Sequence, residues 1–439
     1  MKQFILICIC QLLSTTLHAK EIAPSLLGRA GEESAEGESS FSVSVTNPST
    51  IDRKDVPVVI DLKKTLGEKA ATVTSSFVAV ATNDELPSQL DDLDGDLIPD
   101  ELCFVADIPA GATCSFRVVC SAISSPRAFP PRTAAFMKVW DRKYRYPYIN
   151  SIEYQGRNEP LATYDAIYGH GAQWESELVG FRVYMDHRQS IDIYGKPTPQ
   201  LVLDKTNFYS TREDMAAGLG CDILFAGASV GAGSFRGYID GQPTYVDSVE
   251  ARGQRVIASG PVRAIVEVWD KNWLYNDKTL QMRQRYTIYA GHRDVQVDIQ
   301  LRGADIDHET FCTGVQKIEM ENEGFVTTLS TSQPAASRPS ESGALAASWG
   351  RNIPDKAAED LVEGVGLGVC VLPPYLHSVK EDTLNYLTLL RPADGHIRYH
   401  LAICALMERD GFKDATSWFS WLRQWQADLS HPCTVSVKH

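Results

Sequence analysis

Three runs of residues between positions 262 and 301 decide the fold class. They read Val262-Arg-Ala-Ile-Val-Glu-Val-Trp269, Gln281-Met-Arg-Gln-Arg-Tyr-Thr-Ile-Tyr289 and Val295-Gln-Val-Asp-Ile-Gln-Leu301. Apolar and polar residues alternate in each run, which is the period of a strand with one packed face and one wet face. A similar run covers residues 179–184. The sequence therefore predicts a mainly β protein, with a large antiparallel β-sandwich over residues 133–439.

Shorter apolar runs precede this region and predict a second, smaller domain. They lie at residues 41–45, 56–60, 77–80, 102–105 and 116–119, and turn-forming residues separate them. We therefore expect a small β domain over residues 41–125. A proline-rich connector at residues 124–132 lacks the backbone donors of a central strand, so we place the domain boundary there.

Composition limits the classes of function. The chain has 439 residues, 44% of them hydrophobic, with 42 Lys+Arg against 56 Asp+Glu and a formal net charge of −14. This composition is typical of a folded globular protein. Nucleic-acid binding needs a positive footprint, so the acidic balance argues against a nucleic-acid partner.

The N-terminus has the composition of a secretion signal. Lys2 gives a positive start, residues 4–13 are apolar, and the small residue Ala19 ends the segment in the way signal peptidase requires. We expect residues 1–19 to be a signal peptide, residues 20–40 to be a flexible leader, and the protein to be secreted or periplasmic. No later segment approaches eighteen consecutive apolar residues, so no membrane span is expected after cleavage.

The cysteines show no metal-cluster pattern. Eight of them follow residue 19, and none has zinc-ribbon spacing. In an oxidising compartment some can pair, so we expect mostly buried thiols with one or two disulfides. Cys103, Cys114 and Cys120 are closest in sequence, but spacing alone does not determine the pairing.

The C-terminal region predicts an amphipathic helix. Its apolar residues recur at i, i+3, i+4, i+7 and i+11, and they are Trp418, Trp421, Leu422, Trp425 and Leu429. Asp414 or Thr416 can cap the helix. We expect the apolar stripe to dock on the sandwich rather than to stack on sugars.

An acidic loop is the first motif that suggests chemistry. Residues 91–101 hold carboxylates at alternating positions, and the candidate ligands are Asp92, Asp94, Asp96 and Asp100. Ca²⁺ takes six to eight oxygen ligands, so we expect either a structural Ca²⁺ site or a solvated acidic turn. The loop departs from an EF-hand because Gly95 precedes the fifth ligand position and Cys103 occupies the twelfth. No organic cofactor is expected.

The second motif covers residues 164–196 and is dense in ionisable and aromatic side chains. The catalytic candidates are His170, Glu175, Tyr184 and Asp186. The substrate-binding candidates are Trp174, Arg182, His187, Arg188, Tyr194 and Lys196. Aromatic faces cover the C–H side of a pyranose, while carboxylates and guanidinium groups bind hydroxyls or a uronate carboxylate. The motif therefore predicts a site for an acidic oligo- or polysaccharide.

Local spacing refines this hypothesis. On a strand, Arg182, Tyr184 and Asp186 share one face. Gly169 and Gly171 flank His170 and allow close approach by a ligand or an unusual turn. A single tyrosine or aspartate here is more often a structural hydrogen-bonding residue than a catalytic one. Secondary candidates lie further along the chain, among them Arg283 and Arg285 on one strand face.

Three stretches together resemble the DUF4861 family. They are Ser88-Gln-Leu-Asp-Asp-Leu-Asp-Gly-Asp96 with the acids up to Glu101, Tyr168-Gly-His-Gly-Ala-Gln-Trp-Glu-Ser-Glu177, and Tyr184-Met-Asp-His-Arg-Gln-Ser-Ile-Asp-Ile-Tyr-Gly-Lys196. The resemblance covers nearly all of the mature chain. It implies a secreted bacterial protein usually found beside carbohydrate-degrading genes. It also implies a large β-sandwich like that of galactose mutarotases and several polysaccharide lyases, after a small β domain. Leu97 stands where the acidic loop of the family would have a glycine.

Several functions stay open at this point. β-Elimination of a uronate needs a cation, a base and an acid, for which the candidates are Arg188 or Arg182, then His170, then Tyr184. Hydrolysis would pair Glu175 with Asp186, and mutarotation would pair Glu175 with His170. We prefer elimination because so many cations accompany the phenols. The alternatives are a non-catalytic glycan-binding protein and a purely structural partner protein.

Overall fold

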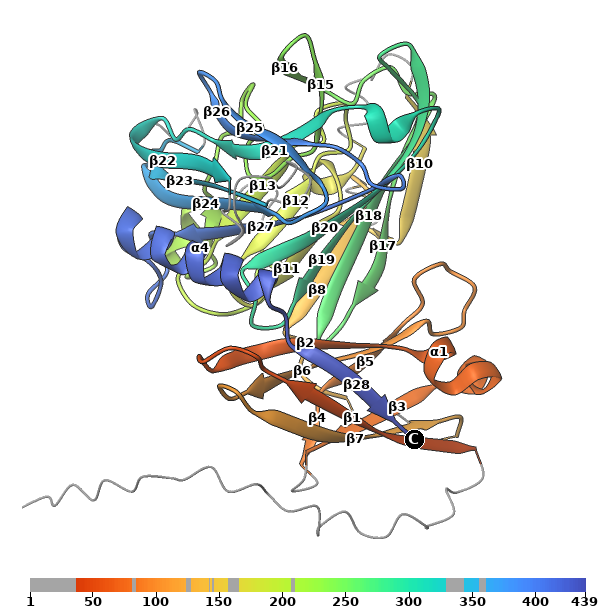
Figure 1. The fold of residues 1–439 in the computed structure, drawn as a ribbon. Helices are drawn as coiled ribbons and strands as arrows, with labels where there is room; N and C mark the ends of the chain where they lie inside the picture. The colour runs from red at the N-terminus through yellow and green to blue at the C-terminus, as the bar shows by residue number, and fades with distance from the viewer. Residues whose placement is uncertain are drawn as a thin grey trace, which may run out of the picture.

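The computed structural model describes residues 37–80, 84–123, 128–141, 143, 146–156, 166–206, 210–328, 343–354 and 361–439. The predicted signal peptide and most of the predicted leader lie outside these residues. In the described part of the chain, no helix is long and apolar enough to cross a membrane. The fold is mainly β with antiparallel pairing throughout the described strands, which confirms the predicted fold class (Figure 1).

The small domain contains two sheets that face each other. The first consists of β28 (Thr434–Lys438), β1 (Glu38–Thr46), β7 (Thr113–Ser121), β3 (Ser75–Ala79) and β4 (Glu85–Leu86). The second consists of β2 (Arg53–Asp61), β6 (Glu101–Ile108) and β5 (Ser88–Asp91). The short helix α1 (Leu62–Leu66) and a 3-10 turn at Gly67–Thr72 follow β2. Alternating residues of β1, β2 and β6, such as Val43, Val58 and Phe104, are fully buried and form its core.

Two of these strands differ from the predicted domain limits. β1 begins at Glu38, so the last residues assigned to the leader form part of a strand. β28 pairs with β1, with Val43 opposite Val437. The chain therefore returns to the small domain after crossing the large one, and residues 434–438 are not part of the large sandwich.

The large domain contains three sheets. The nine-stranded sheet consists of β10 (Ser151–Gln155), β17 (Ala251–Ser259), β18 (Arg263–Tyr275), β19 (Lys278–Tyr289), β20 (Asp294–Arg302), β27 (His396–Ala405), β24 (Glu363–Val371), β23 (Ala344–Asn352) and β22 (Met320–Thr328). The six-stranded sheet consists of β14 (Cys221–Asp222), β13 (Ile191–Gly195), β12 (Gly180–Val183), β11 (Gln173–Ser176), β8 (Thr133–Lys138) and β9 (Tyr148–Ile149). A five-stranded sheet consists of β16 (Gln242–Thr244), β15 (Arg236–Ile239), β21 (Phe311–Gln316), β26 (Asn385–Leu390) and β25 (Leu376–Glu381).

The nine-stranded sheet has the two faces that its alternating sequence predicts. On β20 the residues Val295, Val297 and Ile299 are buried, and the residues between them are less so. The buried side chains join a continuous core with those of the other two sheets. The six-stranded sheet differs, because every residue of β11, β12 and β13 is buried.

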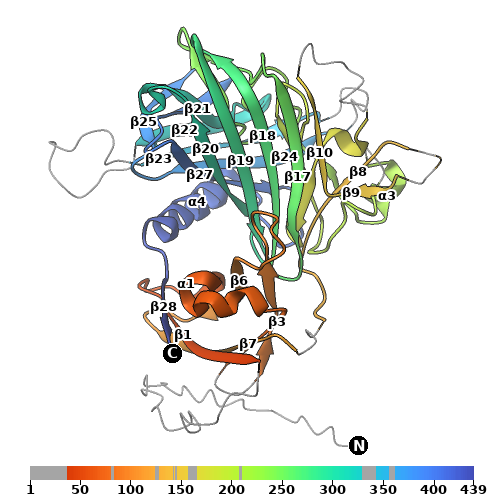
Figure 2. The same cartoon turned by 90° about the vertical axis from the view of Figure 1, so that its right-hand side faces the viewer.

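The outer face of the nine-stranded sheet is covered at two places (Figure 2). Helix α4 (Ala415–Ser430) begins after Asp414, whose carboxylate accepts the backbone N–H of Ser417 at 2.7 Å. Its buried residues Trp418, Leu422 and Trp425 pack on β23, β24 and β27. This packing confirms the predicted docking of the helix on the sandwich.

The acidic loop between β5 and β6 covers the second place. The backbone carbonyl of Leu93 accepts hydrogen bonds from Arg255 and Arg285, both at 3.2 Å. At the base of the loop, the buried Arg263 guanidinium donates to the Asp91 carboxylate at 2.5 Å. Charged contacts therefore join the small domain to β17, β18 and β19.

The eight cysteines from Cys103 to Cys433 are free thiols in the structure. Six of them are buried, and burial raises the pKa of Cys103 and of Cys370 to about 12. The expected disulfides are therefore not formed among these residues, whereas the expected buried thiols are present.

Candidate functional site

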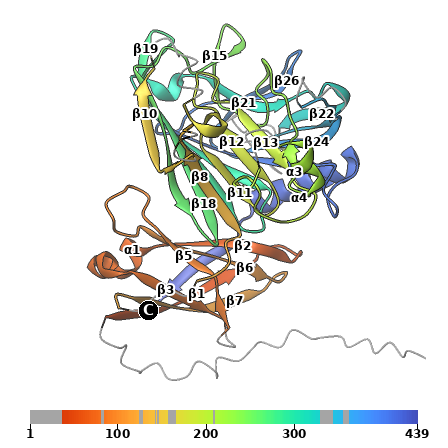
Figure 3. The same ribbon diagram turned by 180° about the vertical axis from the view of Figure 1, so that it is seen from behind.

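The predicted site segment forms neighbouring strands of the six-stranded sheet, which faces the viewer in Figure 3. The structure describes this segment from residue 166 onward, so Tyr164 and Asp165 lie outside the described residues. A 3-10 turn at Tyr168–His170 precedes β11, and residues 184–190 form the turn between β12 and β13. The ten candidate side chains of this segment fall into a buried group and a second group around the turn that follows β12.

Trp174 belongs to the buried group. Its side chain is 0% exposed and stacks on Phe181 with ring centroids 5.5 Å apart, and the Tyr286 ring lies 5.0 Å away. No face of the indole is open to a sugar. Trp174 therefore packs between the sheets, and this placement does not fit the predicted contact with substrate.

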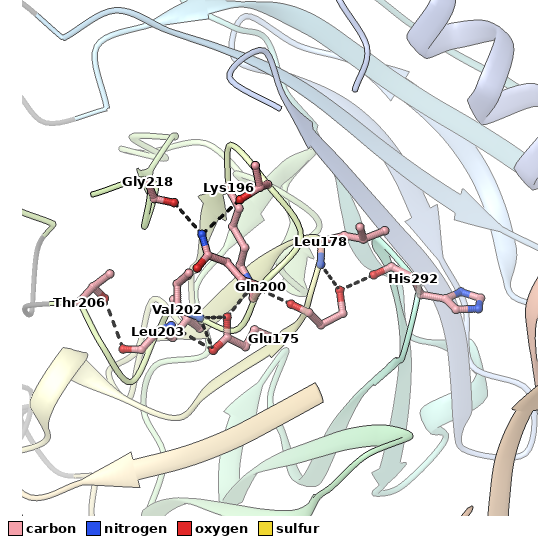
Figure 4. Close-up of polar contacts among 11 residues, drawn as sticks. Glu175, Leu178, Lys196, Gln200, Val202, Leu203, Thr206, Gly218 and His292 are labelled. Atoms are coloured by element: carbon pink, nitrogen blue, oxygen red, sulfur yellow. Dashed lines mark hydrogen bonds and ion pairs between the residues drawn. The ribbon is translucent and has the colours of Figure 1, made fainter. Parts of the chain in front are cut away.

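Glu175 and Lys196 form a buried ion pair (Figure 4). The Lys196 ammonium also donates to the carbonyls of Ser176 at 2.6 Å and of Gln200 at 2.9 Å. The Glu175 carboxylate accepts the backbone N–H groups of Val202 at 2.9 Å and of Leu203 at 3.0 Å. Burial lowers the pKa of Lys196, while the attraction of Glu175 opposes this shift.

This network gives both residues a structural role. Glu175 is 1% exposed, as is Lys196, and their polar atoms are occupied by neighbours within the chain. The pair holds the segment of residues 196–203 against β11. The placement does not fit the predicted catalytic role of Glu175 or the predicted substrate contact of Lys196, because a substrate cannot reach either group.

Arg182 and Tyr194 are the other members of the buried group. The Arg182 guanidinium is paired with Asp192, to which Nε donates at 3.0 Å, and Asp222 lies 3.9 Å away. Its Cζ atom lies 5.5 Å from the centre of the Tyr194 ring, and Tyr194 is 2% exposed. The ion pair therefore sits beneath the surface, and neither residue fits the predicted direct contact with substrate.

The second group surrounds the turn that follows β12. We call it the turn cluster, and it comprises the predicted residues His170, Tyr184, Asp186, His187 and Arg188 together with Tyr245; His170 and Asp186 are each 7% exposed, and the others are partly exposed. The Arg188 Cζ atom lies 4.9 Å from the centre of the Tyr184 ring, and the Arg188 Nε donates to Asp186 at 2.6 Å. The Arg188 side chain is 36% exposed. A cation and a phenol are thus held together at the surface.

His170 and His187 complete the turn cluster from two sides. The His170 ring meets the Tyr184 ring edge-on with centroids 5.7 Å apart, and the His187 ring meets Tyr245 edge-on at 5.2 Å. Arg182 lies under Tyr184, with its Cζ 5.9 Å from the ring centre. The predicted common face of Arg182 and Tyr184 is therefore present, although β12 ends at Val183.

The glycines beside His170 have a packing role. A Cβ atom at Gly171 would lie 1.9 Å from the carbonyl oxygen of Val183, so only glycine fits there. Gly169 has a φ of 77°, and His170 itself has a φ of 62°. The left-handed conformation costs a non-glycine residue roughly 1 kcal/mol or more. The fold therefore holds the His170 backbone in a strained position beside Tyr184.

Behind the turn cluster lies a residue that the sequence analysis missed. Arg236 is 2% exposed and donates to the Phe235 carbonyl and to the Ser190 hydroxyl, both at 2.9 Å. Its Cζ atom lies 5.1 Å from the centre of the Tyr245 ring. Among the described residues it has no carboxylate partner, and burial lowers its pKa. Buried charges are usually paired, so Arg236 is an uncommon feature.

The interior next to Arg236 is also polar. Gln189 donates to the Asp270 carboxylate at 2.7 Å, and Asp270 forms an ion pair with Arg252. The side-chain oxygen of Gln189, both amide atoms of Gln284 and the Tyr286 hydroxyl lack hydrogen-bond partners in the described part of the chain. Unpaired buried polar groups are rare in proteins. The interior of the sandwich behind the turn cluster is therefore polar.

The acidic loop brings together three of its four predicted ligands. Carboxylate oxygens of Asp92, Asp94 and Asp100 lie within 4.8 Å of one another, and Asp96 is not in this group. The Asp92 carboxylate accepts the N–H groups of Gly95 at 2.6 Å and of Leu97 at 2.8 Å. Desolvation opposes ionisation of Asp92, but the backbone hydrogen bonds of the loop together outweigh it and lower the pKa of Asp92. The carboxylates therefore shape the loop themselves.

Leu97, which stands where the family pattern would have a glycine, adopts the backbone conformation that glycine favours. Leu97 is 91% exposed and has a φ of 72°, which is the left-handed conformation that favours glycine. The loop thus keeps its turn in spite of the side chain. Two donors to Asp92 and the N–H of Leu93 to Asp100, at 2.7 Å, fix this conformation.

Comparisons with known proteins complete the description. A family model described as a domain of unknown function (DUF4861) matches residues 45–435. Among solved structures, a protein in glycosyl hydrolase family 38 from Enterococcus faecalis aligns with a TM-score of 0.38 and 8% identity, over 91% of this chain and 47% of its own. An alpha-mannosidase from Enterococcus faecalis V583 aligns with a TM-score of 0.38 and 9% identity, over 91% and 46%. This chain spans about half the length of those two proteins. The search of curated proteins found no match.

Proposed function

The chain belongs to the DUF4861 family, whose description assigns no activity, and we propose from its own residues that it is an enzyme acting on uronate-containing glycans. The proposed reaction is β-elimination at the turn cluster. The observation that carries it is that the Tyr184 ring contacts both His170 and Arg188, with the imidazole centroid 5.7 Å and the guanidinium carbon 4.9 Å from the ring centre. An imidazole, a phenol and a guanidinium are the three groups that elimination needs.

Each group has one role in the proposed step. Arg188 binds the uronate carboxylate and withdraws negative charge from it, which makes the proton at C5 more acidic. His170 takes that proton, the C4–O bond breaks as a C4–C5 double bond forms, and Tyr184 gives its proton to the leaving oxygen. The products are an unsaturated uronate and a new hydroxyl end, so atoms and charges balance. Asp186 orients the guanidinium through the hydrogen bond to Nε.

The buried Arg236 supports an acidic ligand. Its positive charge lies behind Tyr245 and has no carboxylate partner among the described residues. An anionic group bound beside Tyr245 and His187 would offset this charge at low dielectric. A neutral sugar would not offset the charge of Arg236.

The structure disfavours the two other reactions considered from the sequence. Hydrolysis by Glu175 with Asp186 and mutarotation by Glu175 with His170 both need an accessible Glu175 carboxylate. That carboxylate is enclosed by Lys196, Val202 and Leu203. Elimination is the one reaction among the three whose groups all lie in the turn cluster.

A glycan-binding protein without catalysis is the second candidate. The observation that favours it is the small exposure of His170, which is 7%. A base must reach the proton that it removes. In this alternative the turn cluster binds an acidic sugar through Arg188 and Tyr184, and His170 only supports the Tyr184 ring.

One experiment separates the two candidates. The protein is incubated with oligogalacturonate and with alginate oligosaccharides, and the ultraviolet absorbance of unsaturated uronates and the product masses are followed. The enzyme proposal expects unsaturated products from the wild type and from His308→Ala, a control at an exposed histidine, and none from His170→Ala. Retained binding with no products from any variant would favour the binding protein.

We also propose that the acidic loop holds a structural Ca²⁺. Asp92, Asp94 and Asp100 supply three close carboxylate ligands, which is the donor chemistry that Ca²⁺ prefers. The cation would offset the repulsion among these groups where the loop contacts Arg255 and Arg285 through Leu93. Its role would be to stabilise the contact between the domains.

A further inference from the structure

The outer face of the nine-stranded sheet carries a second polar surface, away from the turn cluster. A hollow of about 580 Å³ lies over β17, β18, β19 and β20, and Asp94 of the acidic loop forms part of its wall. The turn cluster lies on the opposite face of the sheet. There, Gln189 of the turn between β12 and β13 donates to the Asp270 carboxylate, which also pairs with Arg252. The hollow and the turn cluster are therefore separated by the sheet itself.

A tryptophan occupies the centre of this face. Strand pairing places Trp269 between Gly253 and Arg283, which in turn lies opposite Gln300. A Cβ atom at Gly253 would lie 2.1 Å from the Trp269 Cζ2, so the glycine makes room for the indole on the sheet. The indole N–H donates to Glu153 at 2.6 Å. The ring is thus fixed in place and only partly covered.

Two acids in the hollow are already neutralised by neighbouring cations. Glu153 forms an ion pair with Lys271 at 2.7 Å. Glu267 is 1% exposed and pairs with Arg255 and with Arg285, both at 2.9 Å. Lys271, Arg255 and Arg285 are therefore already engaged by carboxylates of this chain.

Two arginines beside Trp269 have spare donors. Arg283 is 54% exposed, and its Nε lies 3.6 Å from Glu267, the longest of the contacts to that carboxylate. Arg302 is exposed and forms no ion pair with any described residue. Both point from the same face as Gln300, because Arg283 is opposite Gln300 and Arg302 follows two positions later. Arg302 without an ion-pair partner among the described residues, and Arg283 with one long contact to a carboxylate that other arginines share, leave positive charge beside the tryptophan in a chain with a net charge of −14.

We propose that this hollow is a second binding site, for a pyranose that carries a carboxylate or sulfate group. The Trp269 ring covers the C–H face of the sugar, Arg283 and Arg302 bind the anionic group, and the amide of Gln300 binds a hydroxyl. The volume suits one or two sugar units. The proposed role is binding alone, because the carboxylates of Glu153 and Glu267 are held in ion pairs with neighbouring cations. The site holds an acidic glycan chain independently of the reaction proposed for the turn cluster.

The test measures binding by the full-length chain with titration calorimetry. The probes are oligogalacturonate, an alginate oligosaccharide, a chondroitin sulfate oligosaccharide and a neutral cello-oligosaccharide. The key variant is Arg283→Ala/Arg302→Ala, in the background of His170→Ala/Arg188→Ala so that neither turnover nor binding at the turn cluster interferes. The matched control is Arg351→Ala, an arginine of β23 that is 49% exposed on the same sheet.

We expect at least one acidic probe to bind the His170→Ala/Arg188→Ala protein, with and without the Arg351→Ala control change, alike. The double arginine variant should bind it at least ten-fold more weakly, and added salt should weaken the wild-type interaction. The carboxylated and sulfated probes show which anionic group is preferred. Failure of the enzyme proposal would appear only as absent products, and it would not change these affinities.

Three results would overturn the inference. They are unchanged affinity in the double arginine variant, equal affinity for the neutral probe, and binding of none of the acidic probes. Trp269→Phe provides an internal check, because it keeps an aromatic ring and should lose less affinity than Trp269→Ala. Single-stranded DNA that binds with the same dependence on Arg283 and Arg302 would also contradict the assignment to glycans.

Discussion

The Arg188 guanidinium carbon lies 4.9 Å from the centre of the Tyr184 ring, and this contact holds a cation beside a phenol in the turn between the central strands β12 and β13 of the six-stranded sheet. A cation over an aromatic face is stabilised by roughly 0.5–2 kcal/mol. The hydrogen bond that Arg188 Nε donates to Asp186 also restrains the Arg188 side chain. The arrangement is therefore preorganised for an anionic ligand.

Replacement of Arg188 tests the role of this cation. Arg188→Ala should raise the KM for a uronate oligosaccharide by about ten-fold or more, because a charge-assisted contact is lost. Arg188→Lys should recover part of the loss, since the charge remains. Steady-state kinetics at two salt concentrations measure both effects. An unchanged KM in Arg188→Ala would show that the carboxylate binds elsewhere.

Replacement of Glu175 separates structure from chemistry. Glu175→Gln leaves the Lys196 ammonium buried without its counter-charge, and the free energy of unfolding should fall by about 3–5 kcal/mol. Denaturant unfolding measures this loss. Glu321→Gln is the control, because that glutamate is 75% exposed and its change should stay within about 0.5 kcal/mol. A Glu175→Gln protein with normal stability and no turnover would support a catalytic role for Glu175.

The dependence of stability on pH follows from two partly buried histidines, His292 and His400. Burial alone would lower the pKa of His292, but Asp294 and the Asp55 carbonyl raise it to about 9. The folded state then holds a proton that the unfolded state releases above the ordinary pKa of 6.5. The contribution of His292 is therefore complete below pH 6.5 and is lost as the pH rises toward 9.

His400 acts in the opposite direction. Burial lowers its pKa to about 4, so the unfolded state takes up a proton below pH 6.5 that the folded state refuses. Stability should fall as the pH drops from 6.5 toward 4, and the two histidines together predict a maximum near pH 6.5. Urea unfolding across this range checks the profile. The alkaline decline should flatten in His292→Gln, and an unchanged decline in that variant would contradict the assignment.

Calcium titration tests the acidic loop. Ca²⁺ at a hundred-fold excess over its Kd should stabilise the fold by about 2.7 kcal/mol, and the melting temperature should rise accordingly. Asp92→Asn should abolish the rise. Asp96→Asn removes the same charge from the same loop and should keep most of it, because Asp96 lies outside the close group. Equal losses in both variants would indicate a general charge effect.

The C-terminal helix provides a test of packing against sugar binding. Trp418 is 0% exposed, and its indole N–H donates to the Leu367 carbonyl at 3.2 Å. Trp418→Ala should lower the free energy of unfolding by about 3–5 kcal/mol and leave the glycan affinity of the folded protein unchanged. Chemical unfolding and calorimetry measure the two quantities. A selective loss of affinity would assign the tryptophan to ligand binding.

Much of the fold could be predicted because apolar alternation reports burial directly. Val295, Val297 and Ile299 face the core, and the polar residues between them face outward, as the pattern predicts. The spacing of Trp418, Leu422 and Trp425 predicted helix α4 for the same reason. The pairing of β28 with β1 could not be predicted, since a short C-terminal strand carries no information about its partner.

The site could be predicted only in part. His170, Tyr184 and Arg188 come together because they belong to one continuous segment. The alternation of residues 179–184 suggested a wet face for Arg182, and the ionisable composition of the motif suggested an accessible Glu175. Other segments cover both residues, and sequence spacing does not report such coverage. Arg236 and Tyr245 reach the cluster from distant positions. No local motif marks either residue.

The turnover of the Tyr184→Phe variant tests the central claim most directly. This change removes one hydroxyl and keeps the ring that contacts His170 and Arg188. If Tyr184 gives the proton to the leaving oxygen, kcat on the cleaved uronate oligosaccharide falls by about a hundred-fold or more with an unchanged melting temperature. The control Tyr375→Phe, at a partly exposed tyrosine just before β25 and outside the turn cluster, retains full activity. Wild-type kcat in Tyr184→Phe would contradict the account.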